Sequence, residues 1–256
     1  MTDIRRIVAM GGGGFSARPG DPELDRYVIE SAGVPHPRIC LLPTASGDPD
    51  DQIQRFYRAF HELPCIPSHL SLFRLGGVID IRARLLEQDV IYVGGGSLSN
   101  LLAIWRVHRL DETLRAAWES GILLCGISAG SMCWFRGGVT KSHGDPRAVK
   151  GLGFLPYSNS VHWTSEPERR IVYRAAVRDG RLPPGFGVDD GTALLFDGSD
   201  LVEVVRTHGS AGAFRVDETG EERLDALEIE LEPPAIDAEL VSIEEFRAAR
   251  RRLSLG

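Results

Sequence analysis

A short apolar run that ends in a glycine-flanked serine constrains this fold more than any other feature of the sequence. Ile122-Leu123-Leu124-Cys125 is followed directly by Gly126-Ile127-Ser128-Ala129-Gly130 and then by further small residues. The pattern predicts a buried strand, a sharp turn at Ser128 and a helix that starts immediately after it, because only small neighbours fit so cramped a backbone. Such a turn lifts the serine hydroxyl above the sheet edge, where the helix N-terminus offers N–H groups to an oxyanion. The alternative is a tight glycine-rich turn that carries a surface serine.

Strand and helix patterns alternate over the first two-thirds of the chain. Short apolar runs predict strands, at residues 4–10, 39–42, 70–75, 90–93 and 122–125. Apolar residues at helical spacing predict helices between them, at 22–31 (opened by Asp21-Pro22), 53–63, 101–105 and 114–118. This alternation predicts an α/β fold of three layers, with a mostly parallel sheet and helices on both faces.

After His162 the pattern changes to short strands separated by turn residues. These strands are expected at 188–196, 201–206 and 213–216, and Asp197-Gly198 is a hairpin signal. We expect an antiparallel extension of the same sheet, so that residues 1–256 form a single domain. The capping-box pattern from Ser242 to Glu245 predicts a last helix.

The overall charge and hydropathy argue against nucleic-acid and membrane partners. The formal net charge is −7, the isoelectric point is near 5.5, and no basic stripe interrupts the acidic balance. The apolar runs fall far short of the about 20 residues that span a bilayer. The N-terminus enters a strand pattern without the layout of a signal peptide. These features predict a cytoplasmic protein, whereas they indicate nothing about its oligomeric state.

The cysteines and histidines are scattered along the chain. The four cysteines form no C-x-x-C pair and are expected to be reduced thiols: Cys40, Cys65, Cys125 and Cys133. Neither they nor the seven histidines have the spacing of metal ligands. We therefore predict no structural metal.

Two glycine runs follow predicted strands, but neither has the pattern of a nucleotide site. In Gly11–Gly14 the third glycine of G-x-G-x-x-G is replaced by Ser16, and no lysine of a Walker loop follows either run. The second run, Gly94–Gly96, could instead place backbone N–H groups beside a serine on the neighbouring strand. An oxyanion hole needs two such donors, so Ala129 and either Gly95 or Gly96 are the candidates. For Gly11–Gly14 we expect a plain tight turn.

A serine nucleophile needs a general base, usually histidine, and an acid that fixes the imidazole tautomer. Of the seven histidines, His162 ends a segment that should return to the sheet edge near Ser128; the alternative is a buried structural histidine. Asp190 is the leading acid, with Asp189 expected to point to the opposite side. Further candidates for the acid remain open, namely Glu166 and Asp145.

Four segments in this order resemble the peptidase E family of serine peptidases, relatives of aspartyl dipeptidase and cyanophycinase. They are Tyr92–Ser97, Gly126–Ser131, the His162 segment and Asp190–Ala193, and the resemblance runs from about residue 4 to residue 216. It implies a class I glutamine-amidotransferase-like α/β fold, a Ser–His–acid site, a short peptide substrate and no cofactor. Carried over, Ser128 is the nucleophile and His162 the base. Asp190 stands where the family usually has a glutamate.

The resemblance also implies a specificity residue. Enteric aspartyl dipeptidases cut after an N-terminal aspartate, which an arginine downstream of the histidine binds. Here that stretch is Thr164–Arg170, and Pro167 falls close to the place of the arginine. The candidates for substrate binding are therefore Arg169, Arg170 and Glu166, unless the arginines simply face solvent on a helix.

The function that we predict is that of a serine exopeptidase, similar to a dipeptidase, which acts on short peptides. Two alternatives remain. One is a binding module without catalysis that keeps the amidotransferase-like pocket for a small molecule, suggested by the displaced arginine and by aspartate in place of glutamate. The other is an esterase, which the order of the Ser, His and acid residues and the run Gly94–Gly96 disfavour.

Overall fold

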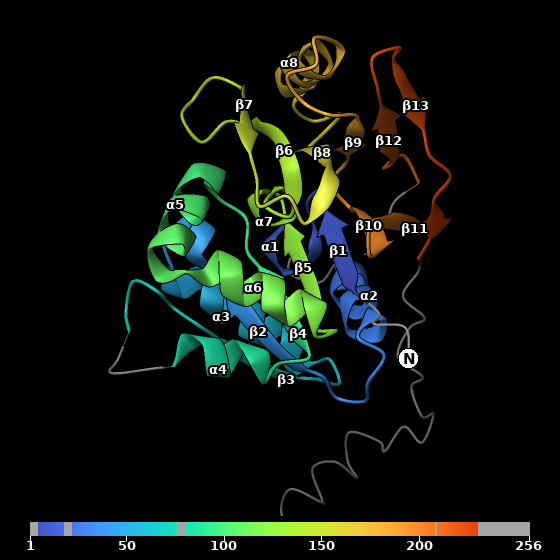
Figure 1. Cartoon of the computed structure of the whole chain (residues 1–256). Coiled ribbons are helices and arrows are strands. Elements are labelled where there is room, and N and C mark those ends of the chain that lie inside the picture. The colour runs from blue at the N-terminus through green and yellow to red at the C-terminus, as the bar shows by residue number, and fades with distance from the viewer. Residues whose placement is uncertain (1–4, 18–21, 76–79, 208, 230–256) are drawn as a thin grey trace, which may run out of the picture.

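The computed structural model describes residues 5–17, 22–75, 80–207 and 209–229, drawn in colour in Figure 1. Asp21 and the last helix expected from the capping box at Ser242–Glu245 lie outside the described residues. Within this part of the chain the strands form two sheets, one of eight strands and one of six. Helices flank both sheets (Figure 1).

The larger sheet has the strand order β14-β11-β10-β1-β5-β4-β2-β3. Its five consecutive strands on one side are parallel, β1 (Arg6–Met10), β5 (Leu123–Ile127), β4 (Val90–Val93), β2 (Arg38–Leu42) and β3 (Ile66–His69). The α/β class expected from the alternating pattern is therefore confirmed. The carboxyl ends of these parallel strands share one edge, which is where ligands bind in open α/β sheets.

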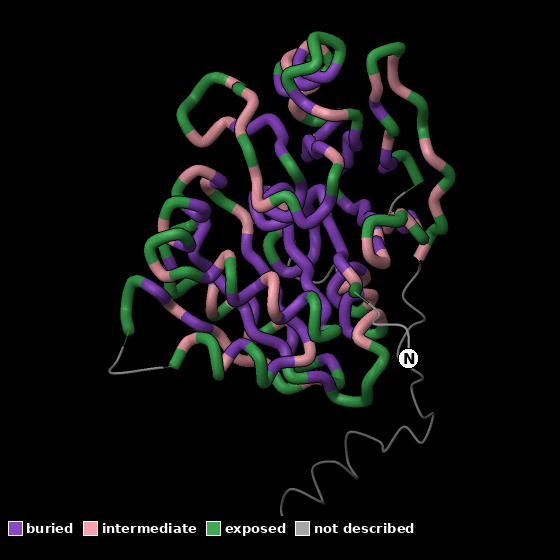
Figure 2. Tube along the Cα trace, viewed as in Figure 1, coloured by how far each residue is buried: buried purple, intermediate pink, exposed green. Residues whose placement is uncertain are grey.

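Helices cover both faces of this sheet because successive side chains of each strand point to opposite faces. In β1, Val8 and Met10 pack with the helices of one face, α1 (Gly14–Ala17), α2 (Glu23–Ser31) and α3 (Asp50–His61). Ile7 and Ala9 pack with those of the other face, α4 (Ile81–Leu86), α5 (Leu98–His108), α6 (Leu110–Glu119) and α7 (Ala129–Met132). The central strands are buried on both sides, as the purple core of Figure 2 shows.

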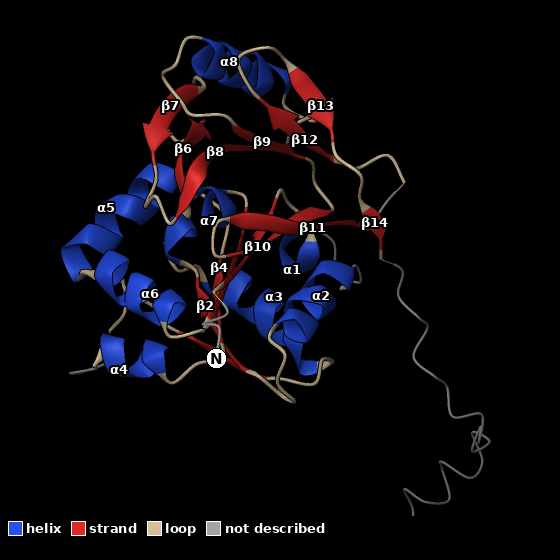
Figure 3. Cartoon of the chain, turned by 45° about the vertical axis from the view of Figure 1, so that its right-hand side comes forward, coloured by secondary structure: helices blue, strands red, loops and turns tan. Residues whose placement is uncertain are grey.

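The smaller sheet has the order β13-β12-β9-β8-β6-β7 and lies above the first one in Figure 3. Its strands are β6 (Phe135–Thr140), β7 (Arg147–Lys150), β8 (Leu155–Val161), β9 (Gly185–Val188), β12 (Ala213–Val216) and β13 (Glu221–Arg223). Helix α8 (Pro167–Arg178) packs on it through a separate apolar cluster that includes Trp163, Tyr173 and Val216. Strand β8 ends at Val161, so this sheet carries the segment of His162 to the edge of the first.

The antiparallel extension divides between the two sheets. Strands β10 (Thr192–Asp197) and β11 (Asp200–Arg206) form the hairpin predicted at Asp197-Gly198 and continue the larger sheet beside β1, with β14 (Leu227–Glu228) outside them. Strand β12 instead pairs with β9 in the smaller sheet. The run expected as one strand at 188–196 breaks at 189–191, where Gly191 has φ +73° and the chain passes from one sheet to the other.

The strand expected at 70–75 is wrong, because the third parallel strand lies earlier, at Ile66–His69. The Asp48 carboxylate accepts hydrogen bonds from the backbone N–H groups of Leu72 and Phe73, at 2.6 and 3.1 Å, so these donors are not free to join a sheet. Pro67 within β3 is compatible with its position at the sheet edge, where a missing N–H is tolerated.

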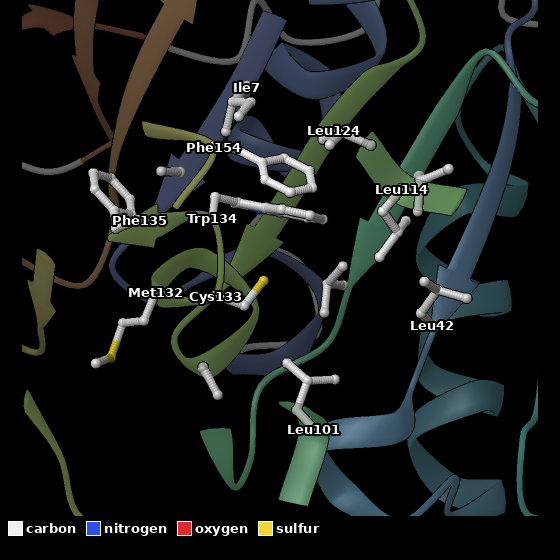
Figure 4. Packing of buried hydrophobic residues seen from close by; sticks show 14 of the residues in the cluster. Ile7, Leu42, Leu101, Leu114, Leu124, Met132, Cys133, Trp134, Phe135 and Phe154 are labelled. Carbon is white, nitrogen blue, oxygen red and sulfur yellow. The ribbon is translucent and has the colours of Figure 1, made fainter. Parts of the chain in front are cut away.

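The turn after Ser128 is anchored from beneath by apolar side chains. Met132 ends the short helix α7, Cys133 and Trp134 follow it, and each of the three is at most 2% exposed. In Figure 4 the ring of Trp134 lies beside that of Phe154, at 5.6 Å between ring centroids. The backbone of the turn therefore has a fixed support in the core.

Candidate active site

Ser128 is held in a backbone conformation that few non-glycine residues adopt. It lies between the end of β5 and the start of α7, with φ +54° and ψ −114°. Its N–H donates to the carbonyl of Met10 at 3.1 Å, which ties the turn to the neighbouring strand β1. Strain of this kind costs about 1–3 kcal/mol and is typical of functional sites.

The two glycines that flank the serine are required by space. A Cβ atom on Gly126 would lie 2.3 Å from the carbonyl oxygen of Gly130, and one on Gly130 would lie 2.2 Å from that of Val93. Both distances are far shorter than any real contact of a Cβ atom. The G-x-S-x-G pattern therefore follows from the close approach of three backbone segments at this turn.

Three side chains from different parts of the fold meet at the sheet edge. The Oγ of Ser128 lies 2.9 Å from Nε2 of His162, and Nδ1 of His162 lies 2.5 Å from Oδ1 of Asp190. His162 follows β8 and, like Ser128, has a positive φ, of +56°. Asp190 lies in the segment that links β9 to β10. The arrangement has the geometry of a nucleophile, a base and an orienting acid.

The carboxylate of Asp190 is hydrogen-bonded to a second residue besides His162. The hydrogen bond with His162 holds the pKa of Asp190 below its ordinary value, while partial burial opposes this. Ser165 donates to the second oxygen, Oδ2, at 3.2 Å. A carboxylate that stays ionised at neutral pH can stabilise the imidazolium that forms when His162 takes a proton.

The other acids considered for this role have different partners. Asp189 is 4% exposed and turns away, accepting hydrogen bonds from the N–H and hydroxyl of Thr164 and from the N–H of Gly212. Glu166 forms ion pairs with Lys141 and Arg169. Asp145 is exposed in the loop between β6 and β7. Of the four candidate carboxylates, only that of Asp190 is hydrogen-bonded to the imidazole of His162.

The second glycine run lies directly beside the serine. A Cβ on Gly95 would be 3.4 Å from the Cβ of Ser128, whereas the N–H of Gly94 is already used by the carbonyl of Leu42. The N–H groups of Gly95 and Gly96 have no acceptor among the described residues. Ala129 is the first residue of α7, where backbone N–H groups have no acceptor within the helix.

The two arginines proposed as substrate ligands differ in where they point. Arg170 forms ion pairs with Glu221 through two nitrogens, and its guanidinium lies over the rings of Trp163 and Phe214. Arg169 is 7% exposed and lies closer to the site, because its Nη1 donates to the carbonyl of Val161, the residue before His162, at 3.4 Å. Burial lowers the pKa of its guanidinium. Its Nε is 3.2 Å from Oε2 of Glu166, so the guanidinium already forms an ion pair with a carboxylate of the protein itself.

The first glycine run takes part in the site, which differs from the plain turn that we expected. Gly12 forms a β-bridge with Asp190, and a Cβ on Gly12 would lie 2.1 Å from Oδ1 of Asp190 and 3.2 Å from Cε1 of His162. The side chains of Asp190 and His162 therefore pack directly against the backbone of Gly12, which has no side chain. The four consecutive glycines after a strand indicate that another segment of the chain packs closely against this backbone. The sequence does not identify that segment.

No helix among the described residues combines the length and apolar character that a bilayer crossing requires.

The solved structure of a peptidase from an acI-B1 Actinobacterium is similar in fold, with a TM-score of 0.66 at 20% identity, covering 87% of this chain and 95% of that one. The class I glutamine-amidotransferase-like fold implied by the resemblance is thereby confirmed.

Sequence comparison identifies the family. The chain is 46% identical over 213 residues to the uncharacterized peptidase YgaJ of Bacillus subtilis (strain 168), covering 83% of this chain and 92% of that protein. It is 28% identical over 134 residues to peptidase E of Streptomyces coelicolor, covering 48% and 55% respectively, which agrees with the peptidase E resemblance. The model of peptidase family S51 matches residues 7–204. The four motifs, the fold and this match agree, and the chain belongs to peptidase family S51.

Proposed function

We propose that this protein is a serine exopeptidase, similar to a dipeptidase, that hydrolyses short peptides through an acyl-enzyme. The observation that carries the proposal is the continuous hydrogen-bonded chain from Ser128 through His162 to Asp190, with contacts of 2.9 and 2.5 Å. A serine hydroxyl is scarcely ionised near neutral pH, so it needs such a base to attack a peptide carbonyl.

In the first half of the reaction, Oγ of Ser128 attacks the scissile carbonyl carbon while Nε2 of His162 accepts the hydroxyl proton. The C–N bond then breaks, and His162 gives this proton to the departing amine. In the second half, water attacks the acyl-enzyme ester, His162 takes a proton from the water and returns it to Oγ of Ser128. The product acid leaves and the serine is regenerated.

The negative charge on the former carbonyl oxygen needs donors that are already in place. The N–H of Ala129 and that of Gly95 or Gly96 are the proposed pair, because Ala129 starts a helix and the two glycine N–H groups have no protein acceptor in the described part of the chain. Loss of one oxyanion donor typically costs about 10²- to 10³-fold in kcat.

Specificity for an N-terminal aspartate is the finer question within this proposal. Arg169 is the one proposed cation near the triad, but Glu166 and Lys141 share its surroundings. An acidic substrate side chain would have to compete with Glu166 for the guanidinium. Asp-Xaa dipeptides therefore belong in the test beside neutral ones.

The test is mass-spectrometric cleavage of a mixed dipeptide library, Asp-Xaa members included, by the wild type and by Ser128→Ala. We expect cleavage by the wild type and a loss of about 10⁴-fold or more in the variant, as for other serine nucleophiles. Turnover by Ser128→Ala equal to that of the wild type would overturn the proposal. No cleavage by either protein, together with no labelling of Ser128 by a fluorophosphonate, would favour the binding module instead.

We also propose a cytoplasmic location and a single domain. All four cysteines are free thiols, as is usual in a reducing compartment. The largest apolar cluster includes Leu124 of the larger sheet and Phe135 and Phe186 of the smaller one, so both sheets share a core.

A further inference from the structure

Two glutamines of this protein are almost completely buried, but their hydrogen bonds differ. Gln88, 7% exposed, uses both ends of its amide: Nε2 donates to the carbonyl of Arg84 at 2.9 Å and Oε1 accepts from Ser68 at 3.5 Å. Gln52, 6% exposed, uses one end, since Oε1 accepts from Ser46 at 2.5 Å. Its Nε2 has no acceptor among the described residues. Nε2 is also absent from the side-chain atoms that are both closed off from solvent and without a partner, so this donor of an otherwise buried residue can be reached from outside.

The surrounding hydrogen bonds determine which end of the Gln52 amide is free. The Ser46 hydroxyl lies 2.9 Å from the carbonyl oxygen of Pro43 and 2.5 Å from Oε1 of Gln52, but it has only one proton. The Pro43 oxygen already accepts the N–H groups of Ser46 and Asp48, which use its two lone pairs. The hydroxyl proton is therefore available to Gln52, and the NH₂ group is the end left without a partner.

The position of this amide relates it to the nucleophile. A Cβ on Gly94 would lie 3.2 Å from Nε2 and 3.4 Å from Oε1 of Gln52, so the amide lies flat against the backbone of that glycine. The next residue, Gly95, faces Ser128. Gln52 is in the first turn of α3, and Ser46 ends the 3₁₀ turn Thr44–Ser46 after β2. Both therefore lie at the carboxyl edge of the sheet, as Ser128 does.

We propose that Gln52 is a substrate-binding residue, whose Nε2 donates a hydrogen bond to a main-chain carbonyl oxygen of a peptide bound along Gly94–Gly96. The inference rests on the proposed peptidase function and adds a contact to it. A neutral amide donor suits a neutral carbonyl acceptor, and the free N–H₂ group gains its missing partner when the peptide binds. The absence of a side chain at Gly94 is what leaves room for the amide.

The experiment compares Gln52→Leu with Gln88→Leu, a matched change at an equally buried glutamine. Peptide hydrolysis is measured for both variants, the wild type and Ser128→Ala, with the thermal melting temperature of each. For Gln52→Leu we expect kcat/KM to fall about five- to thirtyfold, mainly through a higher KM, since a single hydrogen bond to bound substrate is lost. Its melting temperature should stay near that of the wild type. Gln88→Leu should melt earlier and keep kcat/KM within about twofold.

A second substrate separates binding from structural damage. p-Nitrophenyl acetate has no peptide main chain to reach Gln52, so Gln52→Leu should hydrolyse it at the wild-type rate. Gln52→Glu, which keeps the shape but has no donor, should lose peptide hydrolysis at least as strongly as Gln52→Leu. Wild-type kcat/KM for peptides in Gln52→Leu, or an equal loss on both substrates, would overturn the role of Gln52. Peptide turnover that does not depend on Ser128 would instead overturn the proposed function.

Discussion

At the scale of single residues, two adjacent aspartates have opposite surroundings. Asp190 is half exposed and contacts His162, whereas Asp189 is buried and is surrounded by donors from Thr164 and Gly212. Consecutive side chains of an extended segment point to opposite sides, which separates a reacting group from a structural one. The expectation that Asp189 points away from His162 follows from this rule and agrees with the structure.

The first prediction exchanges each of these carboxylates for an amide. Asp190→Asn should lower kcat by up to about 10⁴-fold, because an amide can hold the wrong imidazole tautomer, and should lose less stability than Asp189→Asn because Asp190 is half exposed. Asp189→Asn should leave most of the activity and lose about 1–3 kcal/mol of unfolding free energy, since an NH₂ group would face a buried N–H donor. Steady-state kinetics and urea unfolding of both variants test this. Equal activity losses in the two variants would contradict the division of roles.

Ionisation gives Asp190 a definite pH dependence. Its pKa is lowered in the folded protein, so the stability that it contributes is present above its unfolded pKa and is lost as pH falls through the lower folded value. Asp190 is therefore ionised throughout the neutral range in which we propose that His162 acts as a base.

At the scale of elements, the strand–turn–helix around Ser128 depends on glycines that no other residue can replace. The Cβ of an alanine at position 130 would overlap the carbonyl oxygens of Val93 and Gly94, at 2.2 and 2.9 Å. These oxygens belong to the backbone next to the proposed oxyanion donors. A side chain at this position therefore displaces both the turn and the glycine run.

The second prediction compares two Gly→Ala changes. Gly130→Ala should cost about 1–3 kcal/mol or more through overpacking, and the folded fraction should be nearly inactive. Gly220→Ala is the control, because a Cβ there meets nothing within 4 Å and its φ is not positive. The control should keep full activity and wild-type stability within about 1 kcal/mol. Thermal melting and peptide hydrolysis measure both effects, and an active, stable Gly130→Ala would disprove the argument.

Elements whose sequence signals are local were predicted well. The helix at 53–63 has Ile53, Phe56 and Phe60 at helical spacing, and α3 spans Asp50–His61. The third strand was misplaced because Ile66-Pro67-Ser68-His69 has no apolar run, and it is a strand only through its pairing with β2. The apolar stretch at 70–75 instead donates backbone hydrogen bonds to the carboxylate of Asp48, a residue more than twenty positions earlier.

At the scale of the whole molecule, the site depends on how the two sheets meet. Ser128 comes from the larger sheet and His162 from the end of a strand in the smaller one, while Asp190 lies in the segment that crosses between them. An aromatic cluster joins the sheets: Phe196 of β10 contacts Phe135, Tyr157 and Phe186 of the smaller sheet, at 5.8, 6.1 and 5.6 Å between ring centroids.

The third prediction concerns this junction. Phe196→Ala should cost about 3–5 kcal/mol and also lower kcat, because a cavity between the sheets lets His162 move relative to Ser128. Phe60→Ala removes an equally buried ring that packs with Phe15, Phe56 and Tyr92 under the larger sheet alone. We expect it to lose similar stability but to retain most of the activity under conditions where it is folded. Denaturant unfolding with activity at low temperature would test this, and equal activity in the two variants would contradict it.

The sequence by itself determined the features that depend on neighbours along the chain. The parallel strands other than β3, the turn at Ser128 and the Asp197-Gly198 hairpin follow from side-chain periodicity and from the conformational freedom of glycine, which act over a few residues. Only the tertiary structure decided the second sheet, the contact of Gly12 with Asp190 and the position of the Gln52 amide beside Gly94. These join segments far apart in the chain, and such contacts form only when packing of the whole core brings their backbones together, which no local pattern encodes.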